Sequence, residues 1–342
     1  MSDLILNSLV IENFRILKKL EINPLKRINL LVGENNSGKT TVLEALRFYA
    51  TRAEFISTWL MLNSRDETSD DNFLQQQSAT PIRNIQYLFH RDLIEHGAPQ
   101  KHLSIGSIDG HKLQMTLSQN ILEFKFDGIA HSFNLYDFFL TGINQRYQWN
   151  IEQIPVQFIP AQGLFRQNTE TLWDNIASTE GEDDILNCLK ILHPDIKRIN
   201  FGKDAEYNTT SRIPIVLLEG ELKRRPLRSL GEGLTRLFGL ALSMVNAKNG
   251  WLLVDEIESG LHYSMQPLLW EYLLTLSSRL NVQIFATTHS WDAIQGLQQA
   301  IEKQHQPDAQ LIRLRRIQGE ICAETFTTEE LRIMTRDHLE VR

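Results

Sequence analysis

The sequence predicts an α/β fold with a mostly parallel sheet core, an antiparallel β layer and an inserted helical lobe. The core is predicted because short apolar segments alternate with amphipathic helical segments towards both ends of the chain. This alternation is typical of parallel strands joined by short crossovers. The antiparallel layer is predicted because period-2 segments in the middle of the chain are interrupted by the hairpin signals Asp109-Gly110 and Asp127-Gly128.

The whole chain is expected to form one discontinuous domain, residues 1–342. The core is predicted at residues 1–60 and 213–342, the antiparallel β region at about 100–160, and the helical lobe at about 163–212. A polar, acidic stretch at residues 62–82 predicts an exposed loop.

The individual elements follow from periodicity and turn residues. Strands are predicted at residues 6–14, 17–22, 28–32, 156–159, 213–219, 251–254 and 282–286, with a final hairpin at 309–315 and 321–326. Helices are predicted from residue 41 to about 49–52 and at residues 171–176, 183–192, 234–245, 261–276 and 290–303. A capping-box pattern from Thr327 to Glu330 starts a last helix.

The bulk composition is that of a globular cytoplasmic protein. Of 342 residues, 42% are hydrophobic and 23% are charged, and the net charge is −7. A negative net charge argues against a pervasive basic field, so nucleic-acid binding would need a local patch or the groove of a dimer. Cys188 and Cys322 have no metal-like spacing, and we find no signal peptide and no apolar run long enough for a membrane span.

A phosphate-binding loop is predicted between the strand at 28–32 and the helix that follows it. The stretch Gly33–Thr41 fits the pattern GxxxxGK[ST], and the flanking strand and helix separate it from a glycine-rich loop that merely precedes a helix. Its glycines let backbone N–H groups face a phosphate, and the helix dipole favours the negative charge. The predicted nucleotide-binding residues are Gly33, Asn35, Asn36, Ser37, Gly38, Lys39, Thr40 and Thr41.

Two carboxylates follow the apolar strand at 251–254. Asp255 is predicted to hold Mg²⁺ together with the hydroxyl of Thr40, and Glu256 is predicted to polarise the water that attacks the γ-phosphate. The alternative is that both residues are merely solvent-exposed acids at a strand end. The phosphate loop elsewhere in the chain favours the functional interpretation. His289 follows another apolar strand, in a position that suits a γ-phosphate sensor.

A second anion site is predicted at the start of the helix 234–245. Ser229, Gly231 and Gly233 supply a hydroxyl and flexible backbone at a helix N-terminus. Because the chain already has one phosphate loop, we expect this site to serve the nucleotide of another subunit. An ordinary helix cap is the alternative.

These motifs occur in the order of an ABC-type ATPase, a P-loop NTPase. Gly33–Thr41 resembles Walker A, Ser229–Gly233 the signature, Asp255-Glu256 Walker B, Glu258–His262 the D-loop and Thr287–Ser290 the H-switch. Asn13-Phe14-Arg15 resembles the lead-in of the branch that contains RecF, the SMC proteins and the OLD family, while Gly33–Thr40 and Ala286–Ser290 resemble the OLD-like ATPases most. The resemblance implies that Gln162 is the Q-loop glutamine and a further Mg²⁺ ligand, and that Lys39, Glu256 and His289 are the catalytic residues.

The resemblance also implies ATP and Mg²⁺ as cofactors and a head-to-tail homodimer that sandwiches two ATP molecules. The stretch after Ser290 is too short for a Toprim nuclease domain, so an OLD-like ATPase without that domain is expected. We therefore expect a switch that controls a separate effector, a nuclease or toxin, in anti-phage defence. The alternative is a RecF-like DNA-binding ATPase in repair, which would use the basic residues Lys223, Arg224, Arg225 and Arg228, or Arg313, Arg315 and Arg316. The signature lacks paired glycines and His262 replaces an aspartate, which disfavours a transporter subunit.

Overall fold

The computed structural model describes residues 4–67, 85–95, 97, 99–135, 151–164, 166–203, 212–304 and 308–337. Three sheets organise them: a six-stranded mixed sheet, a six-stranded antiparallel sheet and a three-stranded antiparallel sheet. Most of the predicted loop at 62–82 lies outside these residues. Its first two residues end the helix α2 (Phe55–Asn63), an element that the sequence pattern does not predict.

The core sheet has the strand order β15-β14-β3-β13-β12-β8. Its strands are β3 (Ile28–Val32), β8 (Val156–Ile159), β12 (Trp251–Val254), β13 (Gln283–Thr287), β14 (Ala309–Ile317) and β15 (Glu320–Phe326). All neighbouring pairs are parallel except β14 with β15. The predicted mostly parallel core is therefore present, and the carboxyl ends of β3, β12 and β13 share one edge.

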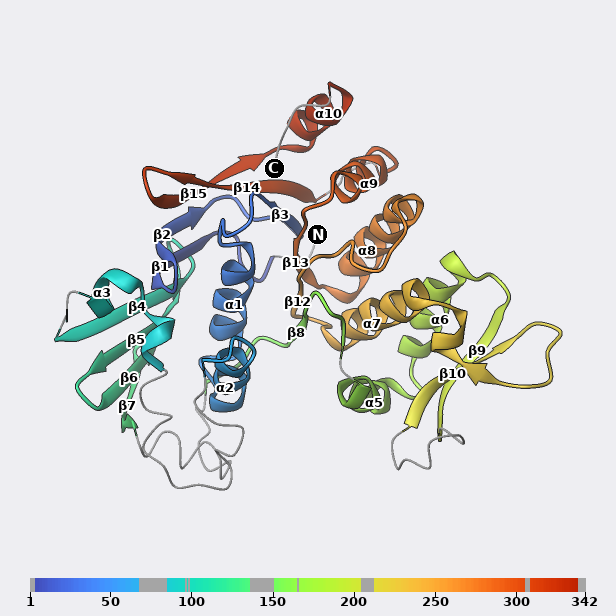
Figure 1. Ribbon diagram of the computed structural model, residues 1–342, viewed down its shortest axis with the longest axis horizontal. Coiled ribbons are helices and arrows are strands. Elements are labelled where there is room, and N and C mark those ends of the chain that lie inside the picture. Colours follow the sequence, from blue (N-terminus) through green and yellow to red (C-terminus); the bar gives the residue numbers. More distant parts are fainter. Residues whose placement is uncertain are drawn as a thin grey trace.

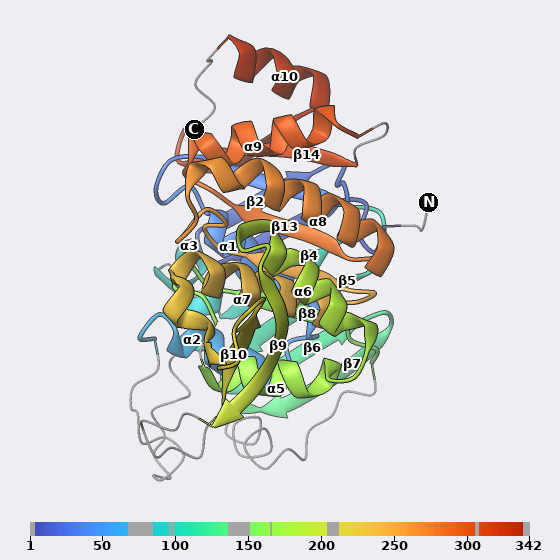
Figure 2. The same ribbon diagram turned by 90° about the vertical axis from the view of Figure 1, so that its right-hand side faces the viewer.

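Helices cover both faces of the core sheet (Figure 1). The helix α1 (Lys39–Ala50) lies on the side of the antiparallel sheet. On the opposite side lie α7 (Glu232–Asn246), α8 (Gln266–Leu280) and α9 (Trp291–Glu302), which Figure 2 shows from the front. Side chains alternate along the core strands between two hydrophobic clusters, as with Leu30 and Leu31 of β3. No helix among the described residues is long and apolar enough to cross a membrane.

The antiparallel sheet has the order β2-β1-β4-β5-β6-β7. Its strands are β1 (Leu9–Phe14), β2 (Leu17–Ile22), β4 (Gln100–Gly106), β5 (Lys112–Ser118), β6 (Ile121–Phe126) and β7 (Ile129–Asn134). The hairpins at Asp109-Gly110 and Asp127-Gly128 are thus confirmed. The strands β1 and β2 join this layer, whereas β8, predicted within the antiparallel region, belongs to the core sheet.

The lobe is only partly helical, which corrects the helical prediction for 163–212. It contains α5 (Arg166–Ile176) and α6 (Glu180–Leu192), but residues 196–203 form the strand β9 (Ile196–Lys203). This strand pairs with β10 (Arg212–Leu218), which pairs with the short β11 (Arg225–Pro226). Tertiary packing favours the strand, because Phe201 stacks on Trp173 at a centroid distance of 5.3 Å. The strand predicted at 213–219 therefore exists, but outside the parallel sheet.

A buried ionic network fixes α1 against the antiparallel layer. Glu44 of α1 lies between two arginines, with Arg15 Nε at 3.0 Å and Arg65 Nε at 2.7 Å from its carboxylate oxygens. Burial raises the pKa of Glu44, while the two guanidinium groups oppose that shift. Arg15 also pairs with Glu67 at 2.7 Å, so the network ties the turn between β1 and β2 to α1 and to the end of α2.

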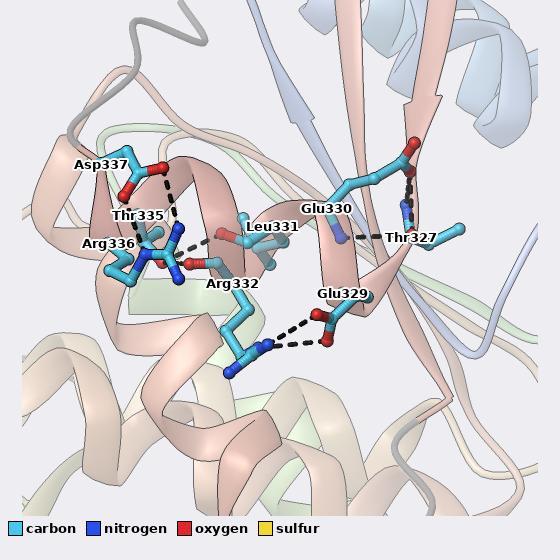
Figure 3. Close-up of polar contacts among 8 residues, drawn as sticks. All are labelled: Thr327, Glu329, Glu330, Leu331, Arg332, Thr335, Arg336 and Asp337. Carbon is cyan, nitrogen blue, oxygen red and sulfur yellow. Dashed lines mark hydrogen bonds and ion pairs between the residues drawn. The ribbon is translucent and has the colours of Figure 1, made fainter.

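The predicted capping box is confirmed at α10 (Thr328–Arg336), which packs beside α9 (Figure 3). The Thr327 hydroxyl accepts from the N–H of Glu330, whose carboxylate accepts from the N–H of Thr327. The ion pair between Glu329 and Arg332 is solvent-exposed, so it adds little to stability. The described residues also include a short helix, α3 (Arg91–Glu95), and the 3₁₀ turns η2 (Leu227–Leu230) and η3 (Tyr263–Met265).

Candidate functional site

The predicted phosphate loop connects the end of β3 to α1 in a conformation that needs its glycines. Gly33 has φ +144°, and a Cβ there would lie 2.4 Å from the carbonyl oxygen of Leu314 in the neighbouring β14. Gly38 has φ +96° and is the N-cap of α1. The loop therefore ends at a helix N-terminus, where unpaired N–H groups and the helix dipole favour an anion.

Lys39 is held at the base of this loop. Its Nζ donates to the carbonyl oxygens of Gly33, at 2.7 Å, and of Glu34, at 2.9 Å, and the residue is only 6% exposed. Burial lowers the pKa of Lys39, and the nearby carboxylates of Asp255, Glu256 and Glu258 oppose that shift. The ammonium group is therefore fixed beside the acids that follow β12.

The loop also contains a buried hydroxyl with no hydrogen-bond partner among the described residues, that of Ser37. A buried unpaired hydroxyl costs free energy unless a ligand or water satisfies it. Because the unpaired Ser37 hydroxyl lies in the same loop as a buried lysine and a helix N-terminus, it could donate a hydrogen bond to a phosphate group bound there.

Three hydroxyl and carboxylate groups meet where β12, β13 and α1 converge. The hydroxyl of Thr40 lies 3.2 Å from both carboxylate oxygens of Asp255, and that of Thr287 donates to Asp255 Oδ1 at 2.6 Å. Hydroxyl and carboxylate oxygens are ligands that Mg²⁺ accepts, usually with one or two carboxylates and the phosphates of the substrate. The donor set therefore fits Mg²⁺, although the described residues include no group of three or more His, Cys, Asp or Glu side chains that could hold a metal ion.

Glu256 adopts a left-handed backbone conformation with φ +48°, which is unusual for a residue with a side chain. Its N–H donates to the hydroxyl of Thr287 at 2.9 Å. Its carboxylate Oε2 accepts from the hydroxyl of Ser259 at 3.1 Å. The backbone and the side chain of Glu256, next to Asp255, are thus each held by one hydrogen bond.

His289 follows β13 and is joined to the D-loop segment by Glu258. One carboxylate oxygen of Glu258 accepts from the N–H of His289 at 2.9 Å, and the other accepts from the hydroxyl of Thr288 at 2.7 Å. The sequence motif contains Glu258 but does not indicate a role for it. In the structure it caps the backbone that carries His289.

The other predicted site residues make no hydrogen bond to this cluster within the described part of the chain. Gln162 is exposed in the turn after β8, and no hydrogen bond joins it to Thr40 or Asp255 in the described chain. Ser229 and Gly231 are exposed at the start of α7, where the Ser229 hydroxyl donates to the carbonyl of Pro226 at 2.7 Å. Gly233 lies in the first turn of α7.

Sequence reasoning misses two residues that organise the site. Thr287 stands out in the sequence only as part of the H-switch motif, yet its hydroxyl contacts both Walker B acids. Arg236 belongs to no motif, although it is the one charged residue in the segment 234–245, which could have marked it as unusual. Its guanidinium group donates to the backbone carbonyls of Asp255 and Glu256 at 3.1 and 3.0 Å.

Comparisons with solved structures agree with this architecture. An SMC head bound to the C-terminal winged-helix domain of ScpA has a TM-score of 0.57 and 14% sequence identity, and the match covers 94% of this chain and 98% of that chain. The Pyrococcus furiosus SMC head with an extended coiled coil, bound to the C-terminal domain of ScpA, has a TM-score of 0.52 and 12% identity, covering 98% and 99%. At these identities the likeness establishes the fold.

Comparisons of sequence identify the family. A Helicobacter pylori protein named ATP/GTP phosphatase is 24% identical over 365 residues, which cover 95% of this chain and 96% of that protein. The DNA replication and repair protein RecF of Prosthecochloris aestuarii is 31% identical over 106 residues, 30% of this chain and 28% of RecF. The family model described as "AAA domain, putative AbiEii toxin, Type IV TA system" matches residues 28–294. The chain therefore belongs to this AAA-domain family and is an ATPase, with a fold like that of the SMC heads and a stretch of sequence similar to RecF.

Proposed function

We propose that this ATPase is a dimeric switch in which ATP joins two copies head to tail and hydrolysis releases them. The main support is that the residues of the predicted second anion site make no hydrogen bond to the phosphate loop of their own chain among the described residues. Lys39, Thr40 and Asp255 gather at one edge of the core sheet, whereas Ser229 and Gly231 are exposed at the start of α7. In the proposed dimer, the start of α7 in one copy completes the nucleotide site of the other.

Within each site, the chain's own residues have separable roles. The loop amides and Lys39 bind the β- and γ-phosphates, because charge-assisted hydrogen bonds are the strong ones at such a site. Glu256 accepts a proton from the attacking water, while Ser259 and Thr287 hold its side chain and backbone. His289, fixed through Glu258, contacts the γ-phosphate.

Mg²⁺ would be held by Thr40 and Asp255, with Gln162 as the further ligand predicted from the sequence. When bound, it would neutralise charge on the phosphate oxygens. Thr287 orients the Asp255 carboxylate for that role by donating to one of its oxygens.

We further propose that the switch acts in the cytoplasm on a separate effector protein, a nuclease or toxin, in anti-phage defence. The motif resemblance to OLD-like ATPases supports this proposal. The description of the matching family, which names a toxin of a toxin–antitoxin system, also points to conflict systems. A pull-down with a tagged variant trapped in the ATP-bound state tests this proposal. If that variant retains one defined protein and the ATP-free wild type does not, the result supports an effector. If the variant retains no protein, the result contradicts the proposal.

A RecF-like role on DNA is the second candidate. The loop between β10 and β11 exposes Lys223 and Arg224, for which the described chain provides no ion pair. Arg225 and Arg228 of the same cluster are paired with Glu221 and Glu232. The similarity to RecF over 106 residues also favours this candidate.

We expect Lys39→Ala to weaken ATP binding by about 10- to 150-fold for each charge-assisted hydrogen bond to phosphate that it removes, since each contributes about 1.5–3 kcal/mol. Isothermal titration calorimetry with ATP measures the change. Lys248→Ala, in the exposed turn after α7, removes a lysine away from the loop and serves as the control. Wild-type ATP affinity in Lys39→Ala would refute the phosphate-loop assignment.

We expect Glu256→Gln to bind ATP normally but to lower kcat by about 10²- to 10⁴-fold, because the amide cannot accept the proton of water. The stalled variant should elute as a dimer in size-exclusion chromatography with ATP and as a monomer without it. Glu302→Gln at the end of α9 is the matched control. Hydrolysis at the wild-type rate would show that Glu256 is not the base.

If DNA is the partner, Lys223→Glu combined with Arg224→Glu should weaken duplex binding and reduce the slope of log K against log salt by about 2, because each phosphate contact contributes about 0.9 to that slope. Arg332→Glu combined with Arg336→Glu on α10 makes the same change in net charge on another part of the surface. Equal effects of the two pairs, or no effect of either, would argue against the loop as a DNA contact.

A further inference from the structure

Arg236 joins three chain segments that surround the nucleotide site. It lies on α7 and is 8% exposed. Its Nη1 donates to the carbonyl oxygen of Pro160 at the end of β8, at 3.0 Å. Its Nη2 donates to the carbonyl oxygens of Asp255 and Glu256, at 3.1 and 3.0 Å.

The guanidinium group is held by backbone carbonyls rather than by a direct ion pair. Within the described residues Arg236 has no carboxylate partner at ion-pair distance, although the charges of Glu258, Asp255 and Glu256 act on it from further away. Burial lowers the pKa of Arg236, but guanidinium remains protonated in proteins. A planar fork with fixed donors can reach two segments at once, which the single ammonium group of lysine does less well.

One of the carbonyls that Arg236 contacts belongs to a residue with an unusual backbone conformation, Glu256. Glu256 has φ +48°, and such a conformation persists only where the surroundings impose it. The hydroxyl of Thr287 holds the N–H of Glu256, and Arg236 holds its carbonyl oxygen. With both ends of the residue fixed, the direction of its Cα–Cβ bond is fixed, and the hydrogen bond from Ser259 then orients the carboxylate.

The place of Arg236 along α7 adds a second consequence. The helix follows Gly231, and Gly233 lies three residues before Arg236, so the two are about one turn apart. A displacement of the start of α7 therefore moves the group that holds the Walker B backbone.

We propose that Arg236 is a positioning residue that sets the backbone of Glu256 and links the start of α7 to the hydrolytic site of its own chain. The link between two copies rests on the proposed dimer, whereas the action on Glu256 within one chain does not.

The test compares full-length Arg236→Gln and Arg236→Lys with the wild type by steady-state phosphate release and by ATP binding in calorimetry. We expect Arg236→Gln to lower kcat by about 10- to 100-fold, as small misplacements of catalytic groups do, and to leave the Kd for ATP within about threefold. Arg236→Lys should recover part of kcat, since lysine can still donate to these carbonyls. Arg279→Gln is the control. Arg279 is exposed near the end of α8 and bonds to Asp184 of α6, so its replacement should leave both kcat and the Kd for ATP unchanged.

A kcat within about twofold of the wild type in Arg236→Gln would overturn the proposal, and so would parallel losses of kcat and ATP affinity, which indicate a collapsed site. If Arg236→Gln does not fold by circular dichroism, Arg236→Lys decides: a reduced kcat at unchanged Kd supports the proposal and an unchanged kcat overturns it. The dimer is judged separately. If Glu256→Gln stays monomeric with ATP, the proposed dimeric switch is wrong. That result does not affect the comparison of kcat with Kd, which tests the role of Arg236 within one chain.

Discussion

The parallel pairing of β12 with β13 is the constraint on which the site depends. It sets Val254 opposite Ala286, so the residues that follow both strands emerge together at the edge of the sheet. Thr287 then reaches Asp255 and the N–H of Glu256 with one hydroxyl. Because β3 pairs with the other side of β13, the loop that carries Lys39 and Thr40 arrives at the same edge. Thr40 and Asp255, 215 positions apart in sequence, are thereby brought into hydrogen-bond distance.

The chemical motifs can be predicted from the sequence because each is local. A loop such as Gly33–Thr41 carries its own conformational requirements, and a carboxylate pair after an apolar strand predicts its place at the edge of a parallel sheet. The core strands are predictable for the same reason, since each is a short apolar run bounded by turn residues.

The sequence-based predictions fail or are incomplete where contacts between distant parts of the chain determine the structure. Residues 196–203 form β9 because β10 pairs with them and Phe201 packs on Trp173, neither of which is visible in local periodicity. The structuring roles of Thr287, Glu258 and Arg236 depend on neighbours from other elements. Gln162, assigned by resemblance, lies in an exposed turn, and its metal role remains a prediction.

Backbone strain and buried charge occur together at this edge. Glu256 is held in a left-handed conformation, Arg236 is buried against carbonyl groups, and Lys39 is desolvated beside three acids. Each feature costs folding free energy, and such costs are common at functional sites because they preset the geometry that the reaction needs. The surrounding apolar clusters on both faces of the core sheet offset them.

A disulfide crosslink between two copies tests the head-to-tail arrangement most directly. Asn36 in the loop and Ser229 before α7 are both exposed, so cysteines can be introduced at both positions after the exposed Cys322 is replaced by serine. A head-to-tail dimer predicts a crosslink between two chains that forms under oxidising conditions with ATP and is reduced by Lys39→Ala. A crosslink that forms equally without ATP, or none between chains in its presence, would rule that arrangement out.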